Sequence, residues 1–486
     1  MLYLIFKYWF KTGDASKATY DMFHDIAKKY EKDGIFNISM YPFTNPIIFI
    51  TTPKAYKDIL SDQNNIFKNV SYEFLIGLIG RRNLITSGGA EWKHDRKIIN
   101  PSFKYSRLMS MNGAISKHVD TLMNKIKSSG NQINDLHPYL AHAITHVILE
   151  SAVGIKMADQ DLRLIDYVEG QRKYSDSIVI QAAIPIFFLA PPLFYYTIGL
   201  PVHLARRRIK RFIRDAVDER MEQLKCRGNS PGDAGSLGEE NSPGGANSCL
   251  ADTLIQAHLS NPETVPKEAI IDHVTTFVFV GHKATSYTLN AILFLLASHP
   301  EKQKKLQREL DANFFPRSIN EQIMNNELIN RCEYLSAVIK EGQRVYPISA
   351  SIGRKVTNEF TCNDYIIPAG AEIMFDFNSL TKHPTAFAYK PNEFIPERFI
   401  PGGEGWDPNR HPFSFLPFSH GLRKCIGERL ALSMLKVFLI KILLRYDLHT
   451  SKTMDDIKLV QDIMVYIRTP IDITFTERLI ESRNLA

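Results

Sequence analysis

The sequence predicts a mainly α-helical fold with a few small β-sheets. Helical periodicity runs through most of the 486 residues, and such periodicity is the primary signal for secondary structure. From about Pro266 to Ala297 the residues are apolar on nearly every side, which predicts one long buried helix of roughly 45–50 Å. Residues 35–52 differ, because two short apolar runs bounded by Pro and Asn predict strands.

Composition excludes several classes of protein. The chain has five cysteines, and no two of them form a C-x-x-C pair, so neither a disulfide framework nor a zinc site is expected. This pattern is typical of a reducing compartment or of a protein that faces the cytosol. The net charge of +7 is moderate and forms no basic stripe with interleaved aromatics. We therefore expect no nucleic-acid partner.

Three segments bear on organisation. Met1–Phe10 is apolar but far shorter than the roughly 20 residues that span a bilayer, and no cleavage site for a signal peptide follows it. Ile178–Leu200 is also apolar, but its prolines argue against a straight transmembrane helix. It is either an ordinary buried segment or a patch that touches a membrane surface. Residues 228–248 are rich in Gly, Ser and Pro and predict a flexible surface loop.

The stretch from Phe418 to Gly427 is the most informative one. It reads FSHGLRKCIG and places Cys425 after a glycine turn and two basic residues, directly before a predicted helix. The positive end of the helix dipole and the adjacent Arg423 and Lys424 are expected to favour the thiolate. A thiolate is a soft, electron-donating ligand that suits haem iron. The alternative is an inert buried cysteine.

The pattern F-x-x-G-x-R-x-C-x-G resembles the haem-binding loop of the cytochrome P450 superfamily. This resemblance extends from about residue 35 to 475 and implies the fold of that family, a helix-rich triangular prism formed by a single domain over 1–486. It implies haem b between the long distal helix and the Cys425 loop, with Cys425 as the iron's axial ligand. Residues 1–30 would then be the remnant of an N-terminal anchor and its lead-in, and 228–248 a surface loop rather than a domain linker.

The resemblance also assigns the residues that hold the haem propionates. Trp92 and Arg96 are four apart on a predicted helix, so they share one face. They match the family's W-x-x-x-R pair, in which arginine makes a charge-assisted bond to the carboxylate. Arg354 and Arg423 match two further arginines that face the propionates.

A second motif lies behind the cysteine loop. Glu341 and Arg344 form E-x-x-R on one helix face, and Pro396-Glu397-Arg398-Phe399 follows downstream. The resemblance makes Glu341, Arg344 and Arg398 a structural network. A buried carboxylate with two guanidiniums is costly unless it is fully hydrogen-bonded, so we expect this network to fix geometry.

The expected distal helix departs from the family pattern. Gly281 is kept, and its lack of a side chain would let dioxygen approach the iron and would permit a local widening of the helix. The acid and alcohol that relay protons are replaced by Lys283 and Ala284, neither of which performs that role. Thr285 is the expected catalytic hydroxyl, and it needs a one-residue bulge or a bridging water. Val280 removes the glutamate that esterifies haem in some relatives, so we expect no covalent bond to haem except the one between Cys425 and iron.

The family branch that hydroxylates fatty acids at the omega position is the most similar, on stretches such as 92–97, 150–154 and 279–282. The resemblance implies a monooxygenase that acts on a fatty acid or similar lipid or xenobiotic. Its partners would be NADPH-cytochrome P450 reductase, cytochrome b5 and the membrane surface, at the cytosolic face of the endoplasmic reticulum. Basic residues around Cys425 and over 92–104 would receive an acidic electron donor. Two alternatives stay open: an isomerase or dehydratase of lipid peroxides, and a haem or lipid binder without turnover.

Overall fold

The computed structural model describes most of the chain. The described residues are 2–38, 47–61, 67–68, 72–155, 157, 162–183, 191–197, 199–228, 249–314, 326–349, 351–362 and 364–478. The loop predicted over 228–248 lies outside them except for its first residue, and so does the middle of the apolar segment 178–200.

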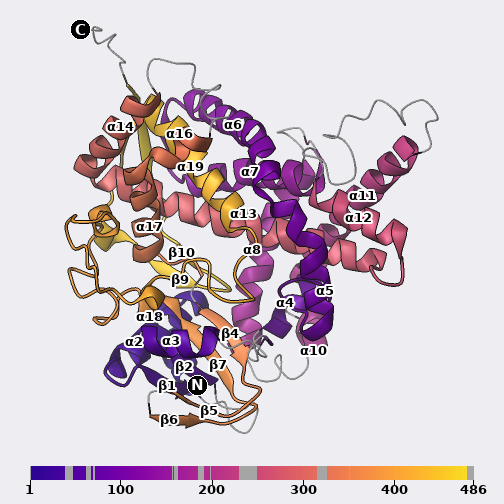
Figure 1. Cartoon of the computed structure of the whole chain (residues 1–486), viewed down its shortest axis with the longest axis horizontal. Helices are drawn as coiled ribbons and strands as arrows, with labels where there is room; N and C mark the ends of the chain where they lie inside the picture. The colour runs from indigo at the N-terminus through magenta and orange to yellow at the C-terminus, as the bar shows by residue number, and fades with distance from the viewer. Residues whose placement is uncertain are drawn as a thin grey trace.

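Helices make up most of the described structure, which confirms the predicted fold class (Figure 1). They are α1 (Leu2–Thr12), α2 (Ala15–Lys29), α3 (Pro53–Leu60), α4 (Glu73–Ile79), α5 (Gly89–Ile99), α6 (Tyr105–Ser128), α7 (His137–Ile148), α8 (Leu162–Ala183), α10 (Pro191–Tyr196), α11 (Leu200–Gly228), α12 (Leu250–Ser260), α13 (Lys267–Ser298), α14 (Pro300–Phe314), α16 (Asn326–Arg331), α17 (Glu333–Val345), α18 (Phe377–Leu380) and α19 (Glu428–Arg445).

The strands form small separate sheets. They are β1 (Ile35–Ile38), β2 (Ile47–Ile50), β3 (Gln132–Ile133), β4 (Ser351–Lys355), β5 (Phe360–Cys362), β6 (Tyr365–Ile367), β7 (Glu372–Asp376), β8 (Tyr446–His449), β9 (Leu459–Gln461), β10 (Val465–Ile467) and β11 (Ile473–Glu477). The largest sheet has the order β1-β2-β7-β4, in which only the β2–β7 pair is parallel. The two strands predicted within 35–52 are thus confirmed as β1 and β2.

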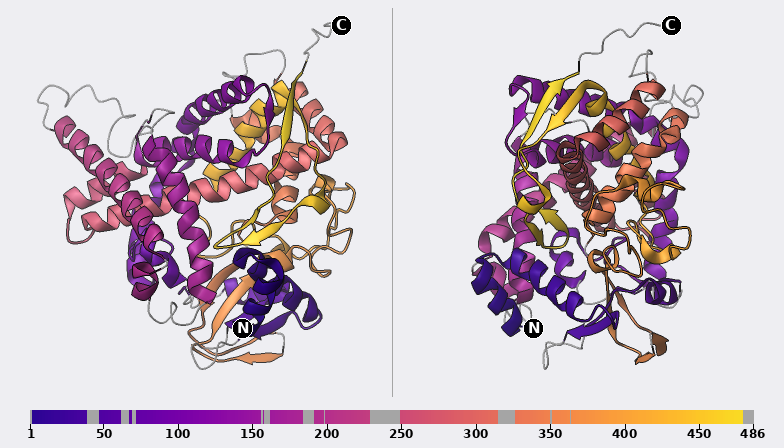
Figure 2. Two further views of the ribbon diagram at one scale, coloured as in Figure 1. Left: turned by 180° about the vertical axis from the view of Figure 1, so that it is seen from behind. Right: turned by 90° about the vertical axis from the view of Figure 1, so that its left-hand side faces the viewer.

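Helix α13 is the long element predicted from the apolar run. Pro266 precedes its first residue and His299 follows its last, as the sequence indicates. It crosses the middle of the molecule among the other helices, while the largest sheet lies at one end (Figures 1 and 2). Most of its side chains are buried because helices pack around it, α7, α11 and α17 among them. The main apolar core gathers around α13, and a smaller core lies under the sheet.

The N-terminal segment joins the folded body through α2. Ala18, Tyr20, Met22 and Ala27 of α2 are buried, and the helix packs against β9 and α8. In the described part of the chain, no helix combines the length and apolarity needed to cross a membrane.

Candidate functional site

The loop that carries Cys425 is shaped by its backbone. The N–H of Cys425 donates to the carbonyl of Phe418 at 3.0 Å, which closes the loop ahead of α19. Gly421 has a φ of +74°, and a Cβ there would come within 2.4 Å of the carbonyl oxygen of Leu60. Glycine is therefore required at this position on two counts, the left-handed backbone and the close approach of another segment.

Opposing effects act on the Cys425 thiol. Burial is the largest effect and, together with Glu428, raises the pKa of this thiol above its ordinary value, while the backbone N–H groups of Gly427 and Glu428 and the guanidinium of Arg96 act in the opposite direction. The helix N-terminus thus favours the thiolate as expected, but burial outweighs it, and the cation that helps is Arg96. Lys424, which the sequence suggested for that role, instead pairs with Glu428 at 2.6 Å.

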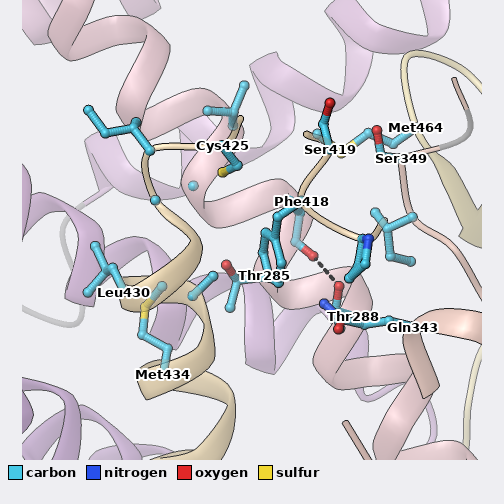
Figure 3. A pocket seen from close by; sticks show the side chains of 18 of the residues that line it. Thr285, Thr288, Gln343, Ser349, Phe418, Ser419, Cys425, Leu430, Met434 and Met464 are labelled. Carbon is cyan, nitrogen blue, oxygen red and sulfur yellow. Dashed lines mark hydrogen bonds between the residues drawn. The ribbon is translucent and has the colours of Figure 1, made fainter. Parts of the chain in front are cut away.

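Cys425 opens onto a cavity of about 340 Å³. One wall consists of the Cys425 loop and the start of α19, and another consists of α13 (Figure 3). The remaining walls include the segment 347–349, which follows α17. Apolar side chains dominate the lining; examples are Phe277, Val280, Ile348, Leu430 and Met434. A cavity of this size, apolar with a few polar groups, is typical of a small-molecule site.

Cations gather at one side of this cavity. Lys68, Arg354 and Arg423 all line it. Burial, then Arg354 and Arg96, lower the pKa of Arg423 to about 9. Burial, then Arg354 and Arg423, lower the pKa of Lys68. Among the residues that the structure describes, no carboxylate pairs with Lys68 or Arg354. Such a cluster of buried cations is suited to an anionic group that enters the cavity.

Trp92 and Arg96 stand behind this cluster on α5. The guanidinium of Arg423 lies over the ring of Trp92, 3.9 Å from its centroid. Arg96 donates to the carbonyl of Lys424 at 3.2 Å. In the described part of the chain neither Trp92 nor Arg96 lines the cavity. Their contacts support the cysteine loop and orient Arg423. That Trp92 and Arg96 also hold a propionate stays a prediction.

Glu341, Arg344 and Arg398 form one buried network. Arg344 binds Glu341 through Nε and Nη2, both at 2.8 Å, and Arg398 Nε reaches Glu341 at 3.0 Å. Nη2 of Arg344 also donates to the backbone carbonyl of residue 393, and the remaining guanidinium nitrogens donate to those of residues 381, 389, 390 and 391. Because every charge is satisfied, the network fixes the segment 389–393 against α17.

Helix α13 presents Gly281, Ala284, Thr285 and Thr288 to the cavity. It is α-helical from Lys267 to Ser298, so the local widening that Gly281 would permit is not present. Thr285 lines the cavity without a bulge, as Figure 3 shows. A Cβ at Gly281 would lie 3.1 Å from Cδ1 of Ile148, so this glycine also allows α13 and α7 to pack closely.

Lys283 takes no part in the cavity wall. Its ammonium contacts Asp462 Oδ2 at 2.6 Å and Ser175 Oγ at 2.7 Å. Sequence reasoning missed this pairing, and it also missed Lys68 as a cavity residue. No local pattern marks either one, since Asp462 is 179 residues away from Lys283.

Comparison with known proteins agrees with this geometry. The family model for cytochrome P450 matches residues 2–475. The chain belongs to the cytochrome P450 family. Similar relatives are cytochrome P450 4c21 of Blattella germanica, 28% identical over 95% of this chain and 88% of that protein, and cytochrome P450 4V2 of Rattus norvegicus, 28% identical over 86% and 78%. Cytochrome P450 4V2 of Homo sapiens is 27% identical over 85% of this chain and 77% of that protein.

Membership of this family makes haem b the cofactor and the chain an oxidoreductase of the monooxygenase type. The residues present fit that cofactor, because a cysteine at a helix N-terminus faces an apolar cavity that is also lined by Lys68, Arg354 and Arg423. Haem b is an apolar macrocycle that carries two propionates and an iron atom to which a thiolate can bind. The apolar lining suits the macrocycle, the cations suit the propionates, and Cys425 suits the iron.

Proposed function

We propose that this cytochrome P450 inserts one oxygen atom from O₂ into a lipophilic substrate, a fatty acid or a similar lipid or xenobiotic. The observation that carries the proposal is the cavity, with Cys425 on one wall and the apolar face of α13 on another. In the overall reaction a C–H bond becomes C–OH, and the second oxygen atom leaves as water. NADPH supplies the two electrons, and the second proton comes from solvent.

Bound haem supplies the oxidation chemistry, and the chain's residues place it and exclude water. Cys425 would bind the iron through its thiolate, and Arg354, Arg423 and Lys68 would hold the propionates from the cavity wall, with Trp92 and Arg96 beside them. Trp92 and Arg96 keep Arg423 and the Cys425 loop in position. Glu341, Arg344 and Arg398 hold the segment that precedes this loop.

Thr285 is the hydroxyl that we assign to proton delivery. On the described face of α13 toward the cavity, Thr285 and Thr288 carry hydroxyls, and that of Thr288 donates to the carbonyl of Ala284. Gly281 also lines the cavity, and because it has no side chain it leaves space next to these hydroxyls. With Ala284 at the usual position of the alcohol, Thr285 holds the proton one residue further along the helix.

The surface supports the proposed partners. Lys93, Lys97, Lys424 and Arg429 are exposed on α5 and around the Cys425 loop. They would receive the acidic face of NADPH-cytochrome P450 reductase or of cytochrome b5.

An apolar patch supports contact with the endoplasmic reticulum membrane at its cytosolic face. Leu193 and Tyr196 of α10 and Leu200 and Leu204 of α11 are exposed. Of the predicted segment 178–200, Ile178 is buried whereas Leu193, Tyr196 and Leu200 are exposed, so the exposed part is the part that we propose for membrane contact.

The test measures product formed per NADPH consumed, with purified protein, reductase, and medium- and long-chain fatty acids. We expect hydroxylated product in a substantial ratio to NADPH. Consumption of NADPH with release of peroxide alone would overturn the proposal.

The isomerase or dehydratase alternative rests on Lys283, since α13 lacks the acid that relays protons and such enzymes do not need it. Turnover of lipid hydroperoxides without reductase would favour it.

A further inference from the structure

Lys283 joins three elements of the fold. It lies on α13, its ammonium donates to Ser175 on α8, and it forms an ion pair with Asp462 in the turn between β9 and β10. The Lys283 and Asp462 side chains are 6% and 1% exposed. A buried ion pair is weak evidence for stability, because desolvation offsets much of the attraction. The pair therefore needs another explanation.

Asp462 connects this pair to the cavity. Its second carboxylate oxygen, Oδ1, accepts the backbone N–H of Met464 at 2.7 Å, and its own N–H donates to the carbonyl of Met464 at 3.0 Å. Met464 lines the cavity (Figure 3). One carboxylate thus holds the distal helix with one oxygen and the backbone of a cavity residue with the other.

The hairpin has a second attachment to the cavity wall. The N–H of Val465 donates to the carbonyl of Ile348 at 2.8 Å, and Ile348 lines the cavity. This bond fixes β10 at one point, so movement of the turn would pivot around Val465. The Lys283–Asp462 pair supplies the other point, three residues earlier in the chain.

We propose that Lys283 and Asp462 are positioning residues that fix Met464 and so determine which molecules fit beside the haem. The lysine that replaces the acid of the distal helix then serves substrate selection through the hairpin. Asp176 lies near this pair. Burial raises the pKa of Asp176, and the charge of Asp462 raises it further. Replacing Lys283 with Asp would therefore bring carboxylates together in a buried place, which is unfavourable.

Two nitrogen ligands of haem iron test the proposal, imidazole and the bulkier phenylimidazole. The ratio of their dissociation constants, measured by titration of the haem absorption band, reports the space near Met464. In Asp462→Asn the amide has one acceptor oxygen, so it serves either Lys283 or the N–H of Met464. We expect the ratio to change on the order of fivefold, the equivalent of one lost hydrogen bond. Met464→Ala should change it as well, and the double variant should add little beyond Met464→Ala.

Asp120→Asn is the matched control. Lys441 is also a buried lysine that binds a serine hydroxyl, that of Ser116 at 2.8 Å, and an aspartate, Asp120 at 2.6 Å, and neither Lys441 nor Asp120 lines the cavity in the described structure. An unchanged ratio in Asp462→Asn, with only a lower unfolding temperature as in Asp120→Asn, would overturn the proposal. Additive effects of Asp462→Asn and Met464→Ala would overturn it too. If Asp462→Asn does not fold, Lys283→Gln gives the same comparison.

The inference rests on haem in this cavity, and the unmodified protein tests that point separately. If imidazole causes no spectral shift in the unmodified protein, the proposed function fails. If the shift is normal and the ratio stays constant among variants, only the role of Lys283 and Asp462 fails.

Discussion

The guanidinium of Arg423 lies 3.9 Å from the ring centroid of Trp92 and also donates to the carbonyl of Ser87 at 2.9 Å. Arg423 is thereby held at the cavity by an aromatic face below it and by the segment before α5. A desolvated cation–π contact contributes about 2 kcal/mol. The position of Arg423 at the cavity is thus supported by a tryptophan of α5.

Trp92→Leu should weaken haem binding, because Arg423 loses its aromatic support. We expect haem to dissociate roughly tenfold faster, with a smaller effect in Trp92→Phe, which keeps an aromatic face. The measurement is transfer of haem to an excess of apomyoglobin. Equal rates in Trp92→Leu and the unmodified protein would contradict the assigned role.

Glu341→Gln should destabilise the protein strongly. It leaves Arg344 and Arg398 buried around a neutral amide, and breaking a buried pair costs about 3–5 kcal/mol. Denaturant unfolding of the holoprotein measures this loss. The control is Glu359→Gln, an exposed carboxylate for which we expect a change within about 0.5 kcal/mol. Similar values for the two variants would show that the network adds little.

Asp95 should make stability depend on acid pH. Burial raises its pKa, but hydrogen bonds from His273 and Arg82 outweigh burial and bring it to about 2, below the ordinary value of 3.8. Because the folded-state pKa is depressed, the contribution is complete above the unfolded pKa and is lost as pH falls from about 4 toward 2. It amounts to about 2 kcal/mol.

Unfolding of the unmodified protein and of Asp95→Asn, compared across pH, tests this contribution. The difference in free energy of unfolding between the unmodified protein and Asp95→Asn should be constant near neutral pH and should become smaller in acid. A difference that stays constant down to pH of about 3 would contradict the assignment.

Gly421→Ala should impair haem loading more than an ordinary strained glycine does. Its Cβ would meet the carbonyl of Leu60 at 2.4 Å and the backbone is left-handed, whereas Gly370 has a φ of +84° with nothing within 4 Å of its Cβ. Gly370→Ala therefore measures strain alone, about 1–2 kcal/mol. Haem content per chain after purification gives the comparison. Equal haem content in the two variants would mean that the backbone at Leu60 shifts easily to make room for the added Cβ, which would contradict this prediction.

Much of the fold could be predicted because its signals are local. The apolar run that becomes α13 has its ends marked by Pro266 and His299, and α5, α17 and α19 carry motifs with helical spacing. These motifs also predicted one buried network, since Glu341, Arg344 and Arg398 do meet.

The features of the site that the sequence did not predict depend on contacts between segments that are far apart in the chain. The sequence shows Lys283 as a departure from a pattern, but only the fold shows Asp462 as its partner. Likewise, nothing local distinguishes Lys68 from an ordinary surface lysine, and the placement of Trp92 behind Arg423 depends on how α5 meets the cysteine loop. The sequence indicated that Gly281 leaves room at the distal helix, but only the fold shows that it also lets α13 pack closely against Ile148.

The iron ligand is tested most directly by the spectrum of the reduced, carbon monoxide-bound protein in the unmodified chain and in Cys425→Ala. We expect the absorption band typical of thiolate-bound haem in the unmodified protein and in the control Cys332→Ala, whose thiol is buried away from the cavity. We expect this band to be lost in Cys425→Ala. A thiolate band that persists without Cys425 would contradict the assignment of the iron ligand and with it the proposed site.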